Sequence, residues 1–306
     1  MRDDGGSSVL PDVTVEVENV VIRPIAKKGT KKGSAGETVV VLSGSREVVM
    51  RTLGAPSRIH RYARATVLAM TAFLTAAGPA LAQGAGDGFL FRPPAGTVVI
   101  RGGFDLARAG SQVFTFVTDE LTVTKRDFSS ASLAFDVAFN VSPRVQGVFT
   151  LGTAQSTIPS EFRGWLDNND RPIQQTTMFH RVPLTGSLKT YLSDPGRAVG
   201  HFAWIPARYA PYVGGGGGIM WYRFQQDGDF IDFNTFKVFR DQFDSDGWAP
   251  TVHAFGGVDV SLSPRFAVTT EGRYQWARAP LSRDFSGFDR IDLSGFALTS
   301  GITIRY

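Results

Sequence analysis

The sequence predicts an all-β fold, an eight-stranded antiparallel up-and-down β-barrel that spans a membrane. From Thr97 onward, apolar and polar residues alternate with period 2 and hardly ever with the helical period of 3.6. Aromatic residues stand at the ends of the apolar faces, as the girdles of a membrane barrel require. The connections also alternate between short turns and long loops, which is the asymmetry of such a barrel.

The predicted barrel covers residues 96–306. Its eight strands are expected near 97–107, 131–141, 144–154, 177–192, 209–224, 248–262, 265–277 and 291–306. Short periplasmic connections are expected at 142–143, 193–208 and 263–264, and long outer loops near 108–130, 155–176, 225–248 and 278–290. A secreted β-sandwich or a lipocalin-like barrel would alternate as well. The charged and small residues of the second face favour a narrow polar lumen over an oily core.

Residues 50–82 have the three parts of a secretory signal peptide. A basic segment from Arg58 to Arg64 precedes the apolar run 65–77, and Ala80-Leu-Ala82 matches a cleavage site. The apolar run is too short for a spanning helix, which needs roughly 20 apolar residues. We expect translation to start at Met50 and cleavage to follow Ala82. Residues 1–49 would then be a non-native or disordered extension, with an unusual cytoplasmic extension as the alternative, and 83–95 a periplasmic N-terminal segment.

The charge balance gives no indication of a nucleic-acid partner. Residues 1–82 contain 11 of the 32 basic and 7 of the 28 acidic residues, so the remainder carries no net charge. The excess positive charge lies where we expect the chain to be removed, and the basic isoelectric point says nothing about partners. The sequence contains no cysteine, which excludes disulfides and thiolate metal sites. We expect no cofactor.

Strand parity places nine charged residues on the inward face. They are Arg101, Asp105, Asp136, Arg181, Lys189, Asp259, Glu271, Arg273 and Arg305. Charges excluded from water must be paired or suffer a heavy desolvation penalty. We therefore expect cross-lumen ion pairs that close the barrel, with a gated pore or proton path as the alternative.

Aromatic residues form two further candidate features. The expected girdle consists of Trp221, Trp248, Phe266, Trp276 and Tyr306. In the third loop, aromatic residues recur near the helical period and predict a short helix with Asn234 as its N-cap. This candidate interaction stripe consists of Phe233, Phe236, Phe239 and Phe243. The stripe has two possible roles: contact with a hydrophobic ligand, lipopolysaccharide or a partner, or folding over the barrel mouth. The first-loop segment 114–121 is expected to behave in the same way.

Three segments give the chain a family resemblance. The strand 211–218 with five consecutive glycines, the two Ser-Pro-Arg turns at 142–144 and 263–265, and the terminal 301–306 resemble the small outer-membrane barrels of the OmpA-transmembrane-like, OmpW-like and opacity-protein-like families. The resemblance covers about 96–306. It implies a place in the outer membrane, contact with its lipid and lipopolysaccharide, and insertion by the barrel-assembly machinery. That machinery reads a terminal aromatic residue, here Tyr306 instead of the more frequent Phe.

We weigh three functions. A structural or surface-interaction barrel is favoured, an OmpW-like conduit or binder for small hydrophobic molecules comes second, and a lipid A-modifying enzyme comes third. His253 and Ser261 face the same side but are roughly 26 Å apart along one strand at about 3.3 Å per residue. They form no nucleophile–base pair, and we expect no enzymatic activity. The oligomeric state is not predicted.

Overall fold

The computed structural model describes residues 23–24, 89–167, 169–200, 203–232 and 237–306. The predicted signal peptide, nearly all of the N-terminal extension and the first part of the segment 83–95 lie outside these residues. The loop residues Phe233, Asn234 and Phe236 do so as well.

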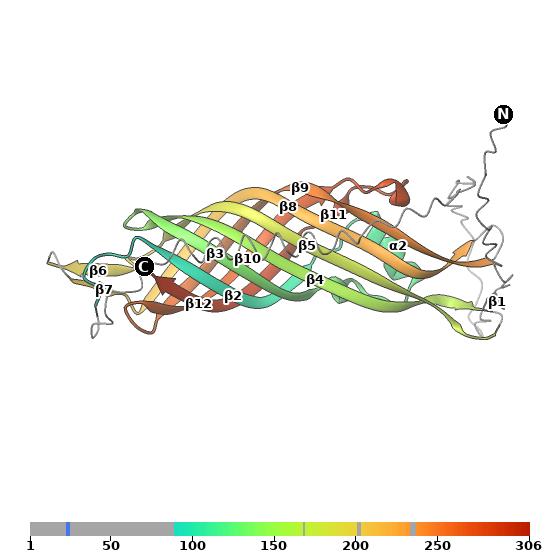
Figure 1. Ribbon diagram of the computed structural model, residues 1–306, viewed down its shortest axis with the longest axis horizontal. Helices are drawn as coiled ribbons and strands as arrows, with labels where there is room; N and C mark the ends of the chain where they lie inside the picture. The colour runs from blue at the N-terminus through green and yellow to red at the C-terminus, as the bar shows by residue number, and fades with distance from the viewer. Residues whose placement is uncertain (1–22, 25–88, 168, 201–202, 233–236) are drawn as a thin grey trace, which may run out of the picture.

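Eight long strands form one closed antiparallel ring (Figure 1). In chain order they are β2 (Gly96–Ala107), β3 (Ser130–Ser142), β4 (Val145–Leu166), β5 (Pro172–Tyr191), β8 (Tyr209–Asp232), β9 (Lys237–Ser261), β10 (Phe266–Ala279) and β12 (Gly295–Arg305). Each strand pairs with the next, and β12 pairs with β2 to close the ring. The ring is therefore the expected eight-stranded up-and-down barrel.

The two ends of the barrel differ. At one end, called here the turn end, short turns join β3 to β4 and β9 to β10, and a hairpin of β6 (Gly196–Val199) and β7 (Ala203–Pro206) lies between β5 and β8. The opposite end, the loop end, contains α2 (Gln112–Glu120), η2 (Lys125–Phe128), η3 (Arg283–Phe285) and β11 (Ile291–Asp292). The two-residue strand β1 (Arg23–Pro24) pairs with β4 at this end. In Figure 1 the turn end is at the left.

Two of the predicted long loops are wrong, because the strands on either side of them continue. The β4–β5 and β8–β9 hairpins extend through most of 155–176 and 225–248. Alternate residues of these extensions, such as Ile158, Ile173 and Phe230, remain buried. The extended strands therefore provide hydrogen-bond partners for the backbone and a buried environment for the apolar side chains. Free loops would provide neither.

The helix predicted in the third loop is also wrong for the residues that the structure describes. Phe239 and Phe243 belong to β9, in register with Phe230 and Gln226 of β8. Phe239 and Phe243 are four residues apart, a spacing that a strand with a two-residue repeat also produces. The last strand likewise starts at Gly295 instead of residue 291, because Ile291 and Asp292 pair with β10 as a short separate strand.

The barrel is apolar outside and polar inside, the reverse of a soluble protein. Large apolar side chains exposed on its outer surface include Ile100, Phe104, Leu133, Phe149, Leu188, Ile219, Val252, Leu298 and Ile302. A continuous apolar band of this kind requires a lipid environment. Among the described residues, no helix has the length and apolar character needed to cross a membrane.

Candidate functional site: the closed barrel interior

Arg101 is the centre of the interior network. Its guanidinium donates two hydrogen bonds to Asp136, with Nε 2.8 Å from Oδ2 and Nη2 2.9 Å from Oδ1. Its Nη1 lies 2.5 Å from Glu271 Oε1 and also donates to Thr299 at 3.2 Å. Arg101 is 2% exposed, so these contacts form with little competition from water. One side chain thereby links β2, β3, β10 and β12.

Glu271 accepts two further hydrogen bonds. Arg273 Nε donates to Glu271 Oε1 at 3.0 Å, and the Tyr212 hydroxyl donates to Oε2 at 3.0 Å. The Arg273 guanidinium also lies 4.8 Å from the centre of the Phe255 ring. A buried carboxylate with two cations and a phenol has the partners that offset its desolvation.

A second ion pair lies nearer the turn end. Lys189 Nζ is 2.8 Å from Asp259 Oδ2, which also accepts a hydrogen bond from the Tyr191 hydroxyl at 2.7 Å. Thr269 donates to the other oxygen of Asp259 at 2.7 Å. Lys189 Nζ also lies 3.7 Å above the centre of the Tyr212 ring. Asp259 therefore accepts three hydrogen bonds, and the Lys189 ammonium contacts a carboxylate and an aromatic ring.

A third ion pair lies towards the loop end. Arg181 Nη2 is 2.6 Å from Asp105 Oδ1, and Nη1 donates to the carbonyl of Leu293 at 3.1 Å. Leu293 belongs to the segment that returns from the loop end into the barrel. The pair therefore attaches this segment to the opposite wall.

Arg305 differs from the other eight charges. It donates to Ser261 Oγ at 2.8 Å and to the carbonyls of Ser263 and Pro264 at 3.3 Å. No carboxylate lies within ion-pair distance of Arg305 among the described residues. Its guanidinium is 5.8 Å from the ring of Trp204, which belongs to the β6–β7 hairpin. All nine charged side chains predicted to face inward are buried, and eight of them form ion pairs. The ninth, Arg305, instead binds hydroxyl and carbonyl oxygens at the turn end.

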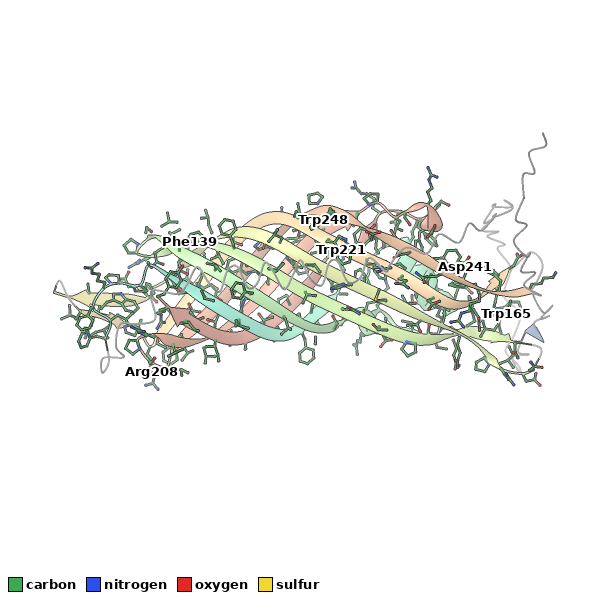
Figure 2. The ribbon with its side chains drawn as sticks, viewed as in Figure 1. Phe139, Trp165, Arg208, Trp221, Asp241 and Trp248 are labelled. Atoms are coloured by element: carbon green, nitrogen blue, oxygen red, sulfur yellow. The ribbon has the colours of Figure 1, made fainter. Side chains whose placement is uncertain are left out.

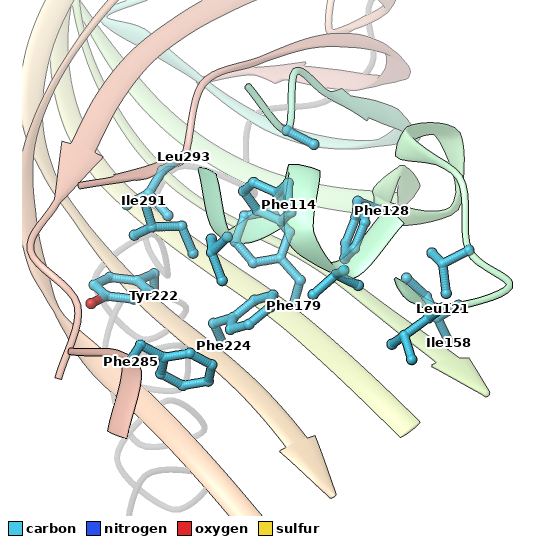
Figure 3. Packing of buried hydrophobic residues seen from close by; sticks show 14 of the residues in the cluster. Phe114, Leu121, Phe128, Ile158, Phe179, Tyr222, Phe224, Phe285, Ile291 and Leu293 are labelled. Atoms are coloured by element: carbon cyan, nitrogen blue, oxygen red, sulfur yellow. The ribbon is translucent and has the colours of Figure 1, made fainter. Parts of the chain in front are cut away.

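An aromatic cluster closes the loop end of the interior (Figure 3). Phe114 of α2 is fully buried, with ring centres 4.8 Å from Phe128, 5.2 Å from Phe179 and 5.7 Å from Phe224. These edge-to-face contacts stabilise beyond the area that they bury. The first-loop segment 114–121 therefore folds into the barrel mouth and buries the Phe114 ring. This is the second of the two outcomes expected for the loops.

The five expected girdle residues lie on the outer surface. Trp221 and Trp248 face each other in the β8–β9 register, and Trp248 is 60% exposed (Figure 2). Trp276 is on β10, while Phe266 and Tyr306 lie at the turn end. Of the stripe, Phe243 packs against Phe230 with ring centres 4.7 Å apart, while Phe239 remains partly exposed. The two do not form a common exposed surface.

His253 has a serine neighbour that the sequence did not reveal. Its Nε2 lies 2.7 Å from Ser187 Oγ of β5, whereas Ser261, considered from the sequence, binds Arg305. Nδ1 of His253 has no hydrogen-bond partner in the described part of the chain, so no carboxylate orients the imidazole as a catalytic triad requires. A Cβ at Gly214 would collide with the Phe255 ring stacked beside His253, so this glycine makes room for a ring.

Little space is left between these layers. Two interior cavities of about 50 and 20 Å³ lie between the charged layers and are lined by Arg101, Arg181 and Arg273 and by Lys189, Tyr212 and Glu271, respectively. Volumes of this size hold a few water molecules. No group of three or more metal-ligating side chains occurs among the described residues.

The chain matches no protein-family model and no curated protein. Solved structures of similar fold include outer membrane protein W of E. coli, with 17% identity and a TM-score of 0.34 over 70% of this chain and 100% of that one. Neisserial surface protein A has 7% identity and a TM-score of 0.36 over 70% and 100%. Ail of Yersinia pestis has 11% identity and a TM-score of 0.36 over 68% and 99%. Likeness at this level does not define a function.

The closed ring, the apolar outer surface and the paired interior charges define a transmembrane β-barrel. Its architecture is that of the small eight-stranded outer-membrane barrels.

Proposed function

We propose that this chain is an outer-membrane β-barrel with a structural or surface-interaction role and a lumen that does not conduct. In this proposal the signal peptide at 50–82 exports the chain, the barrel-assembly machinery inserts it through β12, and the loop end faces outward. The barrel then contacts outer-membrane lipid and lipopolysaccharide. The carrying observation is that three layers of buried ion pairs and one aromatic cluster lie inside the barrel.

The energetic cost of opening supports this proposal. Moving Arg101 aside would leave both Asp136 and Glu271 short of a cation in a buried site. Breaking one buried pair typically costs about 3–5 kcal/mol. A path through the barrel would also have to displace Phe114 from its three aromatic neighbours. We therefore expect the open state to be sparsely populated.

The proposal is tested in planar lipid bilayers with the full-length refolded protein. We expect no steady single-channel steps, and we expect the folded barrel to migrate differently from the boiled protein on SDS gels. Steady conductance would overturn the closed lumen. Partition into buffer without detergent would overturn the membrane assignment.

A conduit for small hydrophobic molecules is the second candidate, favoured by a break in the wall. The β4–β5 pairing passes from Leu151↔Leu184 to Ala154↔Arg181, because Pro183 has no N–H to donate. The 50 Å³ cavity beside this break is lined both by interior residues and by the outward-facing Leu133. Restoring the donor with Pro183→Thr should slow uptake of an apolar fluorophore into liposomes. Equal uptake by the variant, or none by the wild type, counts against a conduit.

We also propose that the barrel is not an enzyme. Ser187 and His253 are both buried in the interior and are not on the surface that meets lipid. Mass spectrometry of lipid A after expression should show no change. A modified lipid A that disappears with His253→Gln would overturn this proposal.

A further inference from the structure

An arginine stands at each place where two strands of the ring meet at the turn end. Arg92 precedes β2 where that strand meets β12, and Arg144 lies in the turn between β3 and β4. Arg208 directly precedes β8 after the β6–β7 hairpin, and Arg265 lies in the turn between β9 and β10. Because these four places follow one another around the ring of eight strands, the arginines are distributed over its whole circumference.

Three of these arginines have no carboxylate to neutralise them. The described residues of the turn end are 89–95, 140–145, 192–200, 203–209, 261–266 and 306. Asp194 is the only acidic side chain among them, and both of its oxygens bind Arg144. Arg92 and Arg208 are exposed and Arg265 is partly exposed, and none of the three forms an ion pair within the described part of the chain. The turn end is therefore positively charged, whereas the loop end carries acidic side chains in η2, η3 and β9.

An exposed aromatic residue adjoins each unpaired arginine in the sequence. Phe91, beside Arg92, is 54% exposed, and Phe266, beside Arg265, is 47% exposed. Tyr209 is 58% exposed, and the Arg208 guanidinium lies 5.7 Å from the centre of its ring at the turn end (Figure 2). Aromatic side chains of membrane barrels gather where the acyl chains meet the headgroups. These pairs therefore place a guanidinium beside each ring at that boundary.

The apolar neighbours of these arginines favour a lipid headgroup over a water-soluble anion. Leu262 belongs to the same turn as Arg265 and is 70% exposed, and Leu192 at the end of β5 is 60% exposed. A soluble anion would leave these side chains in water, whereas a phospholipid leaflet surrounds them with acyl chains. The same leaflet offers phosphates, which guanidinium groups bind through two parallel hydrogen bonds. A net negative headgroup fits best, because a zwitterionic headgroup adds a cation that the arginines repel.

We propose that three arginine–aromatic pairs, called here the turn-end rim, selectively bind anionic phospholipid headgroups of the phosphatidylglycerol class. The rim consists of Phe91-Arg92, Arg208-Tyr209 and Arg265-Phe266. That the bound leaflet is the periplasmic one rests on the proposed function, which directs the loop end outward. The lipid preference itself is measured in symmetric bilayers, where neither orientation nor conductance plays a part, so either proposal can fail while the other holds.

The test uses the full-length protein in phosphatidylcholine bilayers with a trace of spin-labelled phosphatidylglycerol or spin-labelled phosphatidylcholine of the same acyl chains. Electron paramagnetic resonance measures the fraction of label immobilised at the protein surface. At low salt we expect phosphatidylglycerol to be preferred about fivefold, the factor that one basic side chain near an anionic surface supplies. The preference should fall at about 1 M NaCl, which screens exposed charges. The triple variant Arg92→Gln, Arg208→Gln, Arg265→Gln should show no preference.

The control variant removes three exposed arginines from the loop end, Arg278→Gln, Arg283→Gln and Arg290→Gln, and should keep the preference. Arg278 is matched to Arg265, because the two lie at opposite ends of β10. Their single variants serve the same comparison if heat-modifiable migration shows that a triple variant is not folded. No preference in the wild type, or equal loss in the two triple variants, would overturn the proposal. Sedimentation with isolated peptidoglycan that requires the rim arginines, without any lipid preference, would overturn it in favour of a cell-wall partner.

Discussion

Arg101 and Glu271 are 170 residues apart in the sequence, and their side chains meet in the barrel interior with Nη1 2.5 Å from Oε1. The strands that carry them, β2 and β10, are not neighbours, since β12 lies between them. The contact therefore reaches across a strand, next to Thr299. Such contacts brace the ring from within, in addition to the ladder hydrogen bonds around it.

The Glu271–Arg273 contact should be visible as energetic coupling. We expect Glu271→Ala or Arg273→Ala alone to lower the free energy of unfolding by about 3 kcal/mol, because each leaves a buried charge short of a partner. The double variant should cost clearly less than the sum of the singles. Urea unfolding in lipid or detergent measures the cycle. Glu271→Ala combined with the surface substitution Arg144→Ala should be additive, and additivity for the 271–273 pair would show that the two are not coupled.

Phe114→Ala tests the aromatic cluster at the loop end. Removing a fully buried phenyl ring should lower the free energy of unfolding by about 3–5 kcal/mol. If α2 alone sealed the barrel, the variant would also conduct in planar bilayers. We expect no conductance, because the ion-paired layers lie below the cluster. Phe139→Ala, on the outer surface, is the control and should have a much smaller effect on unfolding in detergent.

The Arg144–Asp194 pair at the turn end predicts a pH effect. Arg144 donates to both oxygens of Asp194, at 2.5 and 3.0 Å, and these hydrogen bonds hold the pKa of Asp194 below its usual value. The pair therefore stabilises the fold above the ordinary aspartate pKa and loses that contribution as the pH falls through the lowered pKa. In an NMR titration, Arg144→Gln should return the pKa of Asp194 towards normal. Arg208→Gln should leave it unchanged, and an unshifted pKa in the wild type would contradict the pairing.

The mature protein should begin at Gln83. A signal peptidase that recognises Ala80-Leu-Ala82 would release residues up to Ala82. N-terminal sequencing of protein purified from the membrane fraction checks this. Ala82→Arg should block cleavage, and an unprocessed wild-type chain in the membrane would exclude the predicted signal.

Local alternation was enough to predict the barrel strands. In β9 and β10, for example, His253, Asp259, Glu271 and Arg273 all lie inside, on the side that the period-2 pattern assigned. Alternation failed at the ends of the strands. The segment 225–248 was interpreted as a loop because its polar residues obscure the pattern, and the spacing of Phe239 and Phe243 suggested a helix.

The sequence by itself determined which face each barrel residue occupies, because side chains of a strand alternate strictly whatever its neighbours are. Only the tertiary structure decided the partners. The tilt and stagger of eight strands bring Arg101 to Glu271, Arg181 to Asp105 and Ser187 to His253. No local pattern encodes that stagger. The same is true of the place where β5 and β8 separate beyond Gln175↔Gly228. These two residues are far apart along the chain, so local alternation cannot indicate where their pairing ends.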